Sequence, residues 1–164
     1  MGRQALTDRL IAKLAQSDPI VLRLKGKAVP KARPRMSAKG TVFTPARTKK
    51  FEDYVCSVAS TVNAAPFTCP VKVTVRVDVA VPKSFNSAKR WLAINNYISP
   101  QVGDLDNKVK AITDAINGVL YIDDRQINEL AAVQRYADNH GILVTVERNG
   151  VSVEEAKAIS VVSV

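Results

Sequence analysis

Histidine and cysteine are scarce in this sequence. It contains one histidine, His140, and two cysteines, Cys56 and Cys69. Structural zinc sites combine closely spaced cysteine and histidine ligands, and these three residues lie too far apart in the sequence to form such a pattern. The two cysteines are also too few for a disulfide framework. We therefore expect a reduced, cytoplasmic protein without a zinc site.

Long apolar runs are missing as well. No stretch approaches the roughly 18 apolar residues that a membrane-spanning helix requires. The first residues alternate charged and apolar side chains instead of forming the apolar core of a signal peptide. These features predict a protein that is neither membrane-bound nor secreted.

Acidic residues are absent from a long part of the chain. None occurs between Asp18 and Glu52, a segment with ten basic residues, whereas the whole chain has a net charge of +9. Such a segment favours a polyanionic partner, most commonly nucleic acid, over a merely solubilising loop. Its prolines, Pro30 and Pro34, restrict the backbone and support phosphate contact. The predicted DNA-binding residues are Lys27, Lys31, Arg33, Arg35, Lys49 and Lys50.

The apolar patterning predicts one α+β domain, in which helices pack on a mixed β-sheet. The clearest strand covers residues 71–81, where valine alternates with other side chains and one face is buried. His140 is expected in a hairpin turn, in a structural role. Helices are predicted at residues 5–16, 46–64 and about 106–116, with a helical turn at 88–93. Further strands are predicted at residues 20–24, 119–122, 127–136 and 141–147. We expect residues 1–18 to form an N-terminal helical extension, residues 19–148 the main domain and residues 149–164 a weakly patterned tail.

Four aspartates are crowded into one short part of this basic chain. Asp104 and Asp106 lie where a helical pattern begins, and Asp123 and Asp124 lie where an apolar run ends. We expect folding to bring both pairs to one edge, where they would repel one another without a cation. A hard divalent cation such as Mg²⁺ prefers carboxylate oxygens and keeps positions for water and phosphate. The cluster therefore predicts phosphoryl chemistry.

Simpler interpretations exist for each part of this cluster. Asp106 and Lys110 are four residues apart and would form an ordinary ion pair on an exposed helix. Asp123 and Asp124 would suit a turn. Asp104 favours the catalytic interpretation, because a single carboxylate would suffice to cap the helix.

Two other motifs that begin with Asp-x-Asp fit poorly. A calcium loop starting at Asp104 would need Gly and Glu where the chain has Val109 and Ala115. A dehalogenase-type nucleophile would follow a buried strand, and residues 98–103 make a poor one.

Trp91, the single tryptophan, follows Lys89 and Arg90 within residues 84–100. Packing inside the protein is the usual interpretation of a tryptophan. The alternative is that Trp91 stacks on a base or acts as a wedge at a DNA junction.

Two ordered blocks of the sequence resemble the RusA-type Holliday junction resolvases. Asp-Leu-Asp-Asn at 104–107, Lys110 and Asp-Asp-x-Gln-Ile at 123–127 resemble the active-site block of that family. The run Gly-Lys-Ala-Val-Pro-Lys-Ala-Arg-Pro-Arg at 26–35 resembles its basic opening. The resemblance spans about residues 20–147. Gly103 and the insert 84–100 depart from the family's pattern.

The resemblance implies site residues and an activity. It implies that Asp104, Asp106 and Asp124 are catalytic and bind the metal, with Asp123 as a further candidate ligand, and that Lys110 is the essential lysine. Asn107 and Gln126, polar neighbours of the acids, are candidates to orient the ligands. The implied enzyme is a homodimer that nicks four-way DNA junctions with Mg²⁺, for which Mn²⁺ is a plausible substitute. It would need no small-molecule cofactor and would act in the cytoplasm as a bacterial, prophage or phage protein.

A rival hypothesis assigns no catalysis to the chain. The basic run at residues 26–35, called the basic loop below, would then bind DNA in an accessory protein, and the acids would hold a structural ion. Metal-dependent nicking of a synthetic junction separates the two hypotheses.

Overall fold

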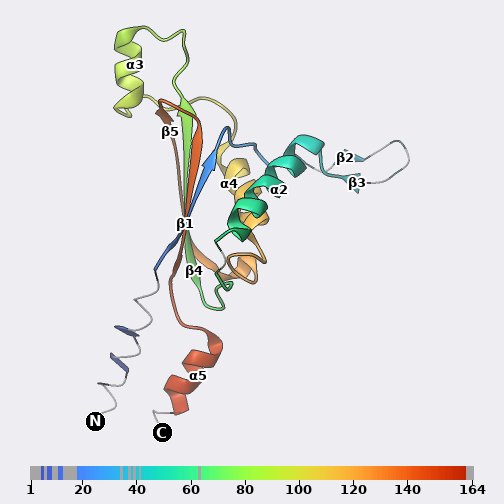
Figure 1. Cartoon of the computed structure of the whole chain (residues 1–164), viewed down its shortest axis with the longest axis vertical. Coiled ribbons are helices and arrows are strands. Elements are labelled where there is room, and N and C mark those ends of the chain that lie inside the picture. Colours follow the sequence, from blue (N-terminus) through green and yellow to red (C-terminus); the bar gives the residue numbers. More distant parts are fainter. Residues whose placement is uncertain are drawn as a thin grey trace.

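A computed structural model describes residues 5, 7–8, 11–12, 18–33, 35–36, 38, 40, 42–62 and 64–161. These residues form the predicted α+β domain around a four-stranded mixed sheet of order β1-β6-β4-β5. A short second sheet pairs β2 (Arg35–Met36) with β3 (Val42–Phe43) and extends away from the main body (Figure 1). The strands of the main sheet are β1 (Ile20–Lys25), β4 (Val71–Ala80), β5 (Ile127–Ala137) and β6 (Gly141–Arg148).

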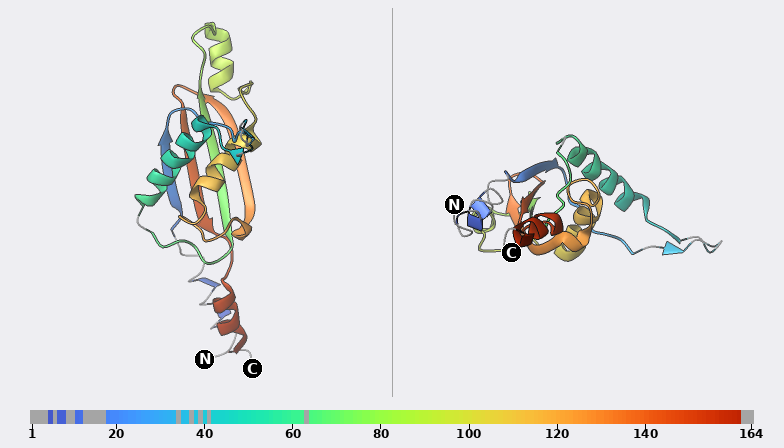
Figure 2. Two further views of the ribbon diagram at one scale, coloured as in Figure 1. Left: turned by 90° about the vertical axis from the view of Figure 1, so that its right-hand side faces the viewer. Right: turned by 90° about the horizontal axis from the view of Figure 1, so that it is seen from below.

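The core lies between one face of the main sheet and two helices. Helices α2 (Ala46–Ser60) and α4 (Leu105–Ile116) cover the same face (Figures 1 and 2). The alternating valines of β4 point to this face and are at most 8% exposed. Both helices contribute apolar side chains at helical spacing, such as Val55 and Ile112, so burial of one stripe per helix stabilises the layer.

The other face of the sheet carries charged side chains that pair across neighbouring strands. Lys72 Nζ lies 2.9 Å from a Glu129 oxygen, and Arg135 Nε donates to Asp78 over 2.9 Å. Strand β4 thus has one apolar and one polar face, as its alternation predicts. Between β4 and β5, the chain forms helix α3 (Ser87–Ile94) and α4. Since β4 and β5 are parallel, this connection must cross from one end of the sheet to the other.

Two local predictions are wrong. Residues 119–122 form turns with isolated bridges at Tyr121 instead of a strand, because Gly118 adopts φ +75° and donates its N–H to the Tyr121 carbonyl over 2.8 Å. His140 does not lie in a hairpin, since β4 lies between β5 and β6 in the sheet. Its Nδ1 accepts the Ala80 N–H at 3.2 Å, which fits the structural role predicted for it.

Both ends of the described chain contain helical residues. The tail forms helix α5 (Val153–Val161), at the end of the sheet opposite α3 (Figure 1). Of the predicted helix 5–16, residues 5, 7–8 and 11–12 are helical, and the others lie outside the described residues. No helix in the described ranges has the length and apolarity that crossing a bilayer requires.

Candidate active site

The start of α4 presents two carboxylates to solvent. Asp104 is the residue before the helix and has extended backbone angles, and Asp106 lies in the first turn. The side chain of Asp104 accepts a hydrogen bond from the Asn107 amide at 3.3 Å. Among the described residues, none forms an ion pair with Asp104 or Asp106. Backbone N–H groups at a helix start favour negative charge there.

Lys108 is a buried cation that sequence reasoning missed. The residue is 5% exposed, and its Nζ donates to the Val102 carbonyl and the Gln134 side chain. Burial lowers the pKa of Lys108, and the negative charge of Asp104 opposes this shift. Gly103 adopts φ +63°, and a Cβ there would lie 3.3 Å from Lys108 Cε. The sequence contained a signal for this burial. Lys108 follows Leu105 by three residues, and residues at this spacing share one face of a helix, here the sheet-facing side of α4.

Lys110 is exposed on α4 and pairs with an acid one turn further on. Its Nζ lies 2.8 Å from Asp114, and the Lys31 Nζ approaches the other oxygen of Asp114 at 3.0 Å. Lys31 also contacts Glu52 at 2.5 Å, and its backbone N–H donates to the Asn107 carbonyl at 2.8 Å. Burial would lower the pKa of Lys31, but its hydrogen bonds to Glu52 and Asp114 raise it overall. Lys31 therefore ties the basic loop to α2 and α4.

The Asp123–Asp124 loop is held in place by its neighbours. The Asp123 carboxylate accepts from the Arg125 backbone N–H at 2.9 Å and from Arg125 Nε at 2.8 Å, which holds the pKa of Asp123 well below its usual range. Gln126 accepts the Asp123 N–H at 2.9 Å and donates to the Phe67 and Cys69 carbonyls. Gln126 thus anchors the loop, while the Asp124 residue stays exposed.

The two pairs of acids lie near opposite ends of α4. Asp104 and Asp106 are at its start, whereas the loop with Asp124 follows its end, where Tyr121 donates to the Thr113 carbonyl at 2.7 Å. A helix of 12 residues is about 18 Å long. Within the described part of the chain, no three His, Cys, Asp or Glu side chains lie close enough to hold a metal ion. A single chain thus does not bring the predicted ligands together.

An apolar groove runs between α4 and the edge strand β5. It has a volume of about 420 Å³, and Asp106 and Lys110 lie on its α4 side. Leu130 and Ala132 of β5 form the opposite side, and Leu130 is 52% exposed. One predicted metal ligand and the predicted essential lysine thus border an exposed apolar surface.

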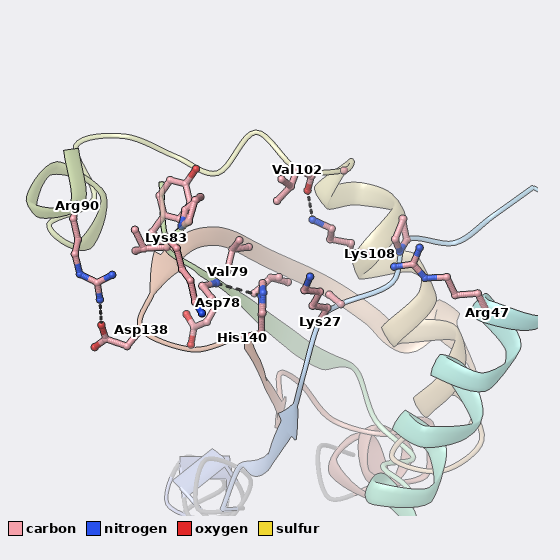
Figure 3. A pocket seen from close by; sticks show the side chains of 18 residues that line it. Lys27, Arg47, Asp78, Val79, Lys83, Arg90, Val102, Lys108, Asp138 and His140 are labelled. Atoms are coloured by element: carbon pink, nitrogen blue, oxygen red, sulfur yellow. Dashed lines mark hydrogen bonds and ion pairs between the residues drawn. The ribbon is translucent and has the colours of Figure 1, made fainter. Parts of the chain in front are cut away.

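A basic cavity of about 780 Å³ lies beside the start of α4 (Figure 3). Its lining includes five Lys and Arg side chains, with Arg90 and Lys108 on opposite sides, but only two acids. Both acids are paired, Asp78 with Arg135 at 2.9 Å and Asp138 with Arg90 at 2.7 Å. Arg90 is neutralised by its pair, but Lys27, Arg47 and Lys83 have no ion-pair partner among the described residues, so the cavity favours an anion. The five basic residues are Lys27, Arg47, Lys83, Arg90 and Lys108.

The other predicted DNA-binding residues lie outside this cavity. Lys49 and Lys50 are exposed on α2, and Arg33 is exposed in the loop before β2. Arg35 belongs to β2.

Comparison with known proteins identifies a family. The family model described as Endodeoxyribonuclease RusA matches residues 25–147. The uncharacterized protein YqaN of Bacillus subtilis (strain 168) is 33% identical to this chain over 136 residues, which cover 79% of the chain and 96% of that protein. The match includes the basic loop, α4 and the Asp123–Asp124 loop.

Proposed function

The chain belongs to the RusA endodeoxyribonuclease family, and from that membership we propose that it is an endonuclease that resolves four-way DNA junctions by paired, symmetric nicks. The observation that carries this proposal is the start of α4. There, two exposed carboxylates without an ion-pair partner among the described residues adjoin a cavity with five basic side chains. Such a site can attract DNA and still present oxygen ligands for a cation.

The chemistry of the ligands fits Mg²⁺, with Mn²⁺ as a substitute. We assign Asp104, Asp106 and Asp124 as the carboxylates that would hold it, since all three are exposed. Asp123 is a weaker candidate, because its carboxylate already accepts hydrogen bonds from Arg125. A bound divalent cation would polarise the scissile phosphate and supply an activated water.

We propose further that a second copy of the chain completes the site. Asp124 lies at the opposite end of α4 from Asp104 and Asp106, so a partner in the reverse direction would bring its Asp124 toward them. Strand β5 is an edge strand with exposed apolar side chains, Leu130 at 52% and Val133 at 47%. A two-fold contact along this edge would cover them and run the two strands in opposite directions.

Lys110 would contact the scissile phosphate. Its pair with Asp114 is a surface ion pair within one helix, worth about 0.3–0.5 kcal/mol. The Nζ can therefore turn to a phosphate at little cost and stabilise the negative charge that develops during hydrolysis. Lys27, Arg33, Lys49 and Lys50 would bind the backbone of the arms.

A mixing experiment tests catalysis and the shared site together. Asp106→Asn and Asp124→Asn should each abolish cleavage, so the two variants are then coexpressed with different tags and the mixed dimer is purified. If the ligands come from two copies, one site of the mixed dimer carries both substitutions and the other carries neither. We therefore expect the mixed dimer to nick one strand of a synthetic four-way junction in Mg²⁺. An inactive mixed dimer would show that each site is built within one chain.

Measurements on the wild-type protein test the rival hypothesis that the chain is a DNA-binding accessory protein. It should form dimers by light scattering, bind four-way junctions more tightly than linear duplex, and cleave them only with Mg²⁺ or Mn²⁺. A chain that binds DNA without nicking any junction in either metal would favour the accessory protein.

A further inference from the structure

The connection between β4 and α4 is basic and contains two exposed aromatic side chains. No acid occurs from residue 79 to residue 103, whereas Lys83, Lys89 and Arg90 are present. Trp91 is 58% exposed and Tyr97 is 69% exposed. The packed interpretation of Trp91 is therefore wrong for this chain.

The backbone fixes the ends of α3. Asn86 precedes the helix, and its side chain accepts the Lys89 N–H at 2.9 Å. Asn96 adopts φ +62°, its N–H donates to the Ala93 carbonyl at 3.1 Å, and the next N–H, of Tyr97, donates to the Leu92 carbonyl at 2.9 Å. This pair of bonds is the Schellman motif, in which the chain turns back along the helix.

That turn stacks Tyr97 on Trp91. The ring centroids are 5.5 Å apart and the ring planes differ by 18°. A contact of this kind often accompanies the motif and would be explained by helix capping alone if it buried the rings. Both rings nevertheless stay more than half exposed, so they form a flat aromatic surface for another group. We call these two residues the aromatic pair.

Helix α3 extends beyond the end of the sheet but is attached to it. Figures 1 and 2 show it at the end of the molecule opposite helix α5. The Phe85 ring packs edge-on against Tyr136 with centroids 5.6 Å apart, and Arg90 pairs with Asp138 at 2.7 Å. Arg90 and Lys83 also line the basic cavity. The aromatic pair and the cavity are therefore parts of one end of the protein.

We propose that the aromatic pair is a stacking platform for an unpaired nucleobase near the branch point, while the basic cavity receives the adjoining phosphate. The inference rests on the proposed function, since it takes DNA as the substrate. The positive charge of the connection between β4 and α4 distinguishes between possible partners of the aromatic pair. Arg90 pairs with Asp138, but Lys83 and Lys89 of this connection have no ion-pair partner among the described residues. A strand of DNA would bring phosphates to these two lysines, whereas an apolar protein surface or a second copy of α3 would leave them unpaired.

The single tryptophan makes the test specific. In EDTA, where cleavage cannot occur, an oligothymidylate should quench the emission of Trp91 in a saturable way. Linear duplex should quench it much less, because its bases stay stacked on one another. Saturating binding of the oligothymidylate without any change in emission would overturn the inference.

Matched variants separate stacking from apolar contact. Trp91→Leu keeps an apolar side chain without a ring, and Trp91→Phe keeps a ring. From about 1–3 kcal/mol per stacked base, Trp91→Leu should weaken binding of a labelled oligothymidylate about 5- to 150-fold. Trp91→Phe should retain most of the affinity. Leu92→Ala, a neighbouring apolar substitution on α3, should bind like the wild type. Circular dichroism checks that each variant is folded, and Tyr97→Leu offers a second variant of the pair.

Failure of this inference is distinguishable from failure of the proposed function. If Trp91→Leu and Tyr97→Leu bind the oligothymidylate as tightly as the wild type, the platform is wrong, although junction cleavage in Mg²⁺ would still stand. If Trp91→Leu converts the dimer to a monomer in light scattering, the pair is a contact between copies and the platform is again wrong. If the wild type neither binds nor cleaves any DNA, both proposals fail.

Discussion

The acids of α4 and of the loop after it belong to two groups. Asp114 and Asp123 are neutralised within the chain, the first by Lys31 and Lys110 and the second by Arg125. Asp104 and Asp106 have no such partner in the described structure, although they lie at the start of the helix that contains Asp114. The first group holds segments of the chain together. The second group keeps its charge available, which a site for an external cation requires.

The basic residues show the same contrast. Lys31 was predicted to bind DNA, but its charge is directed to Glu52 and Asp114 and joins the loop to two helices. Arg33 and Lys50 are exposed and form no ion pair with any of the described residues. A basic segment of the sequence thus contains both structural and available cations, and the partner of each side chain distinguishes them.

The largest expected effect comes from removing an available acid. Asp106→Asn should abolish cleavage while junction binding survives or tightens, because the substitution removes a metal ligand and also a repulsive charge. Gel assays of cleavage and binding with a labelled junction measure both. Glu154→Gln is the matched control, since Glu154 is an exposed acid in the first turn of α5, and it should cleave normally. Cleavage by Asp106→Asn at more than about a tenth of the wild-type rate would contradict the metal assignment.

The second-largest effect is expected for Lys110→Ala. Loss of a group that stabilises developing charge typically costs about 100-fold in rate, whereas one lysine contributes little to the total attraction for DNA. We therefore expect single-turnover cleavage to fall far more than junction affinity. Lys157→Ala, an exposed lysine of α5, is the control. An equal loss of rate and affinity would make Lys110 an ordinary backbone contact.

Asp114→Asn should affect stability, because Asp114 joins α4 to the basic loop. We expect a loss of about 1 kcal/mol in the free energy of unfolding at neutral pH, as for a partly exposed pair of charge-assisted hydrogen bonds. Urea unfolding of the wild type and the variant measures it. If Asp114→Asn is as stable as the wild type, the ion pairs of Asp114 with Lys31 and Lys110 do not contribute to the stability of the fold.

The ion pairs of Asp114 also make the stability of the fold depend on pH. Burial would raise the pKa of Asp114, but the hydrogen bonds from Lys110 and Lys31 lower it overall from its ordinary value of 3.8. A carboxyl whose pKa is lower in the folded protein stabilises the fold above its unfolded pKa, and this stability is lost as the pH falls through the folded pKa. The difference between wild type and Asp114→Asn should therefore be constant near neutral pH and shrink below about pH 3.8.

The smallest effect is expected for single available cations. Arg33→Ala and Lys50→Ala should each lower the slope of log affinity against log salt by about 0.9 for each lost phosphate contact. Lys31→Ala should leave this slope nearly unchanged and lower the stability instead. Titrations of labelled junction DNA at several salt concentrations measure the slope. If Lys31→Ala flattens the slope as much as Arg33→Ala, the division into structural and available cations is wrong.

Local patterns of the sequence were enough to predict several helices and strands and to indicate the family. Alternating valines predicted β4, and helical spacing predicted α4 to within a residue or two. The prediction failed at residues 119–122, where the apolar run suggested a strand. There, the left-handed Gly118 and its hydrogen bond to Tyr121 produce turns. It also failed at His140, because the position of β4 between β5 and β6 is set by the pairing of distant strands.

The α+β character, the basic loop and the two acidic motifs could be read from the amino-acid sequence, because periodicity and charge are properties of neighbouring residues. Which charges are neutralised and which stay available depends instead on how the chain folds. The tertiary structure buried Lys108 against Gln134, directed Lys31 to Glu52 and left the rings of the aromatic pair exposed. It also separated the two acidic motifs along α4. The physical reason is that burial and ion pairing depend on residues far apart in the sequence, which meet only when the chain has folded.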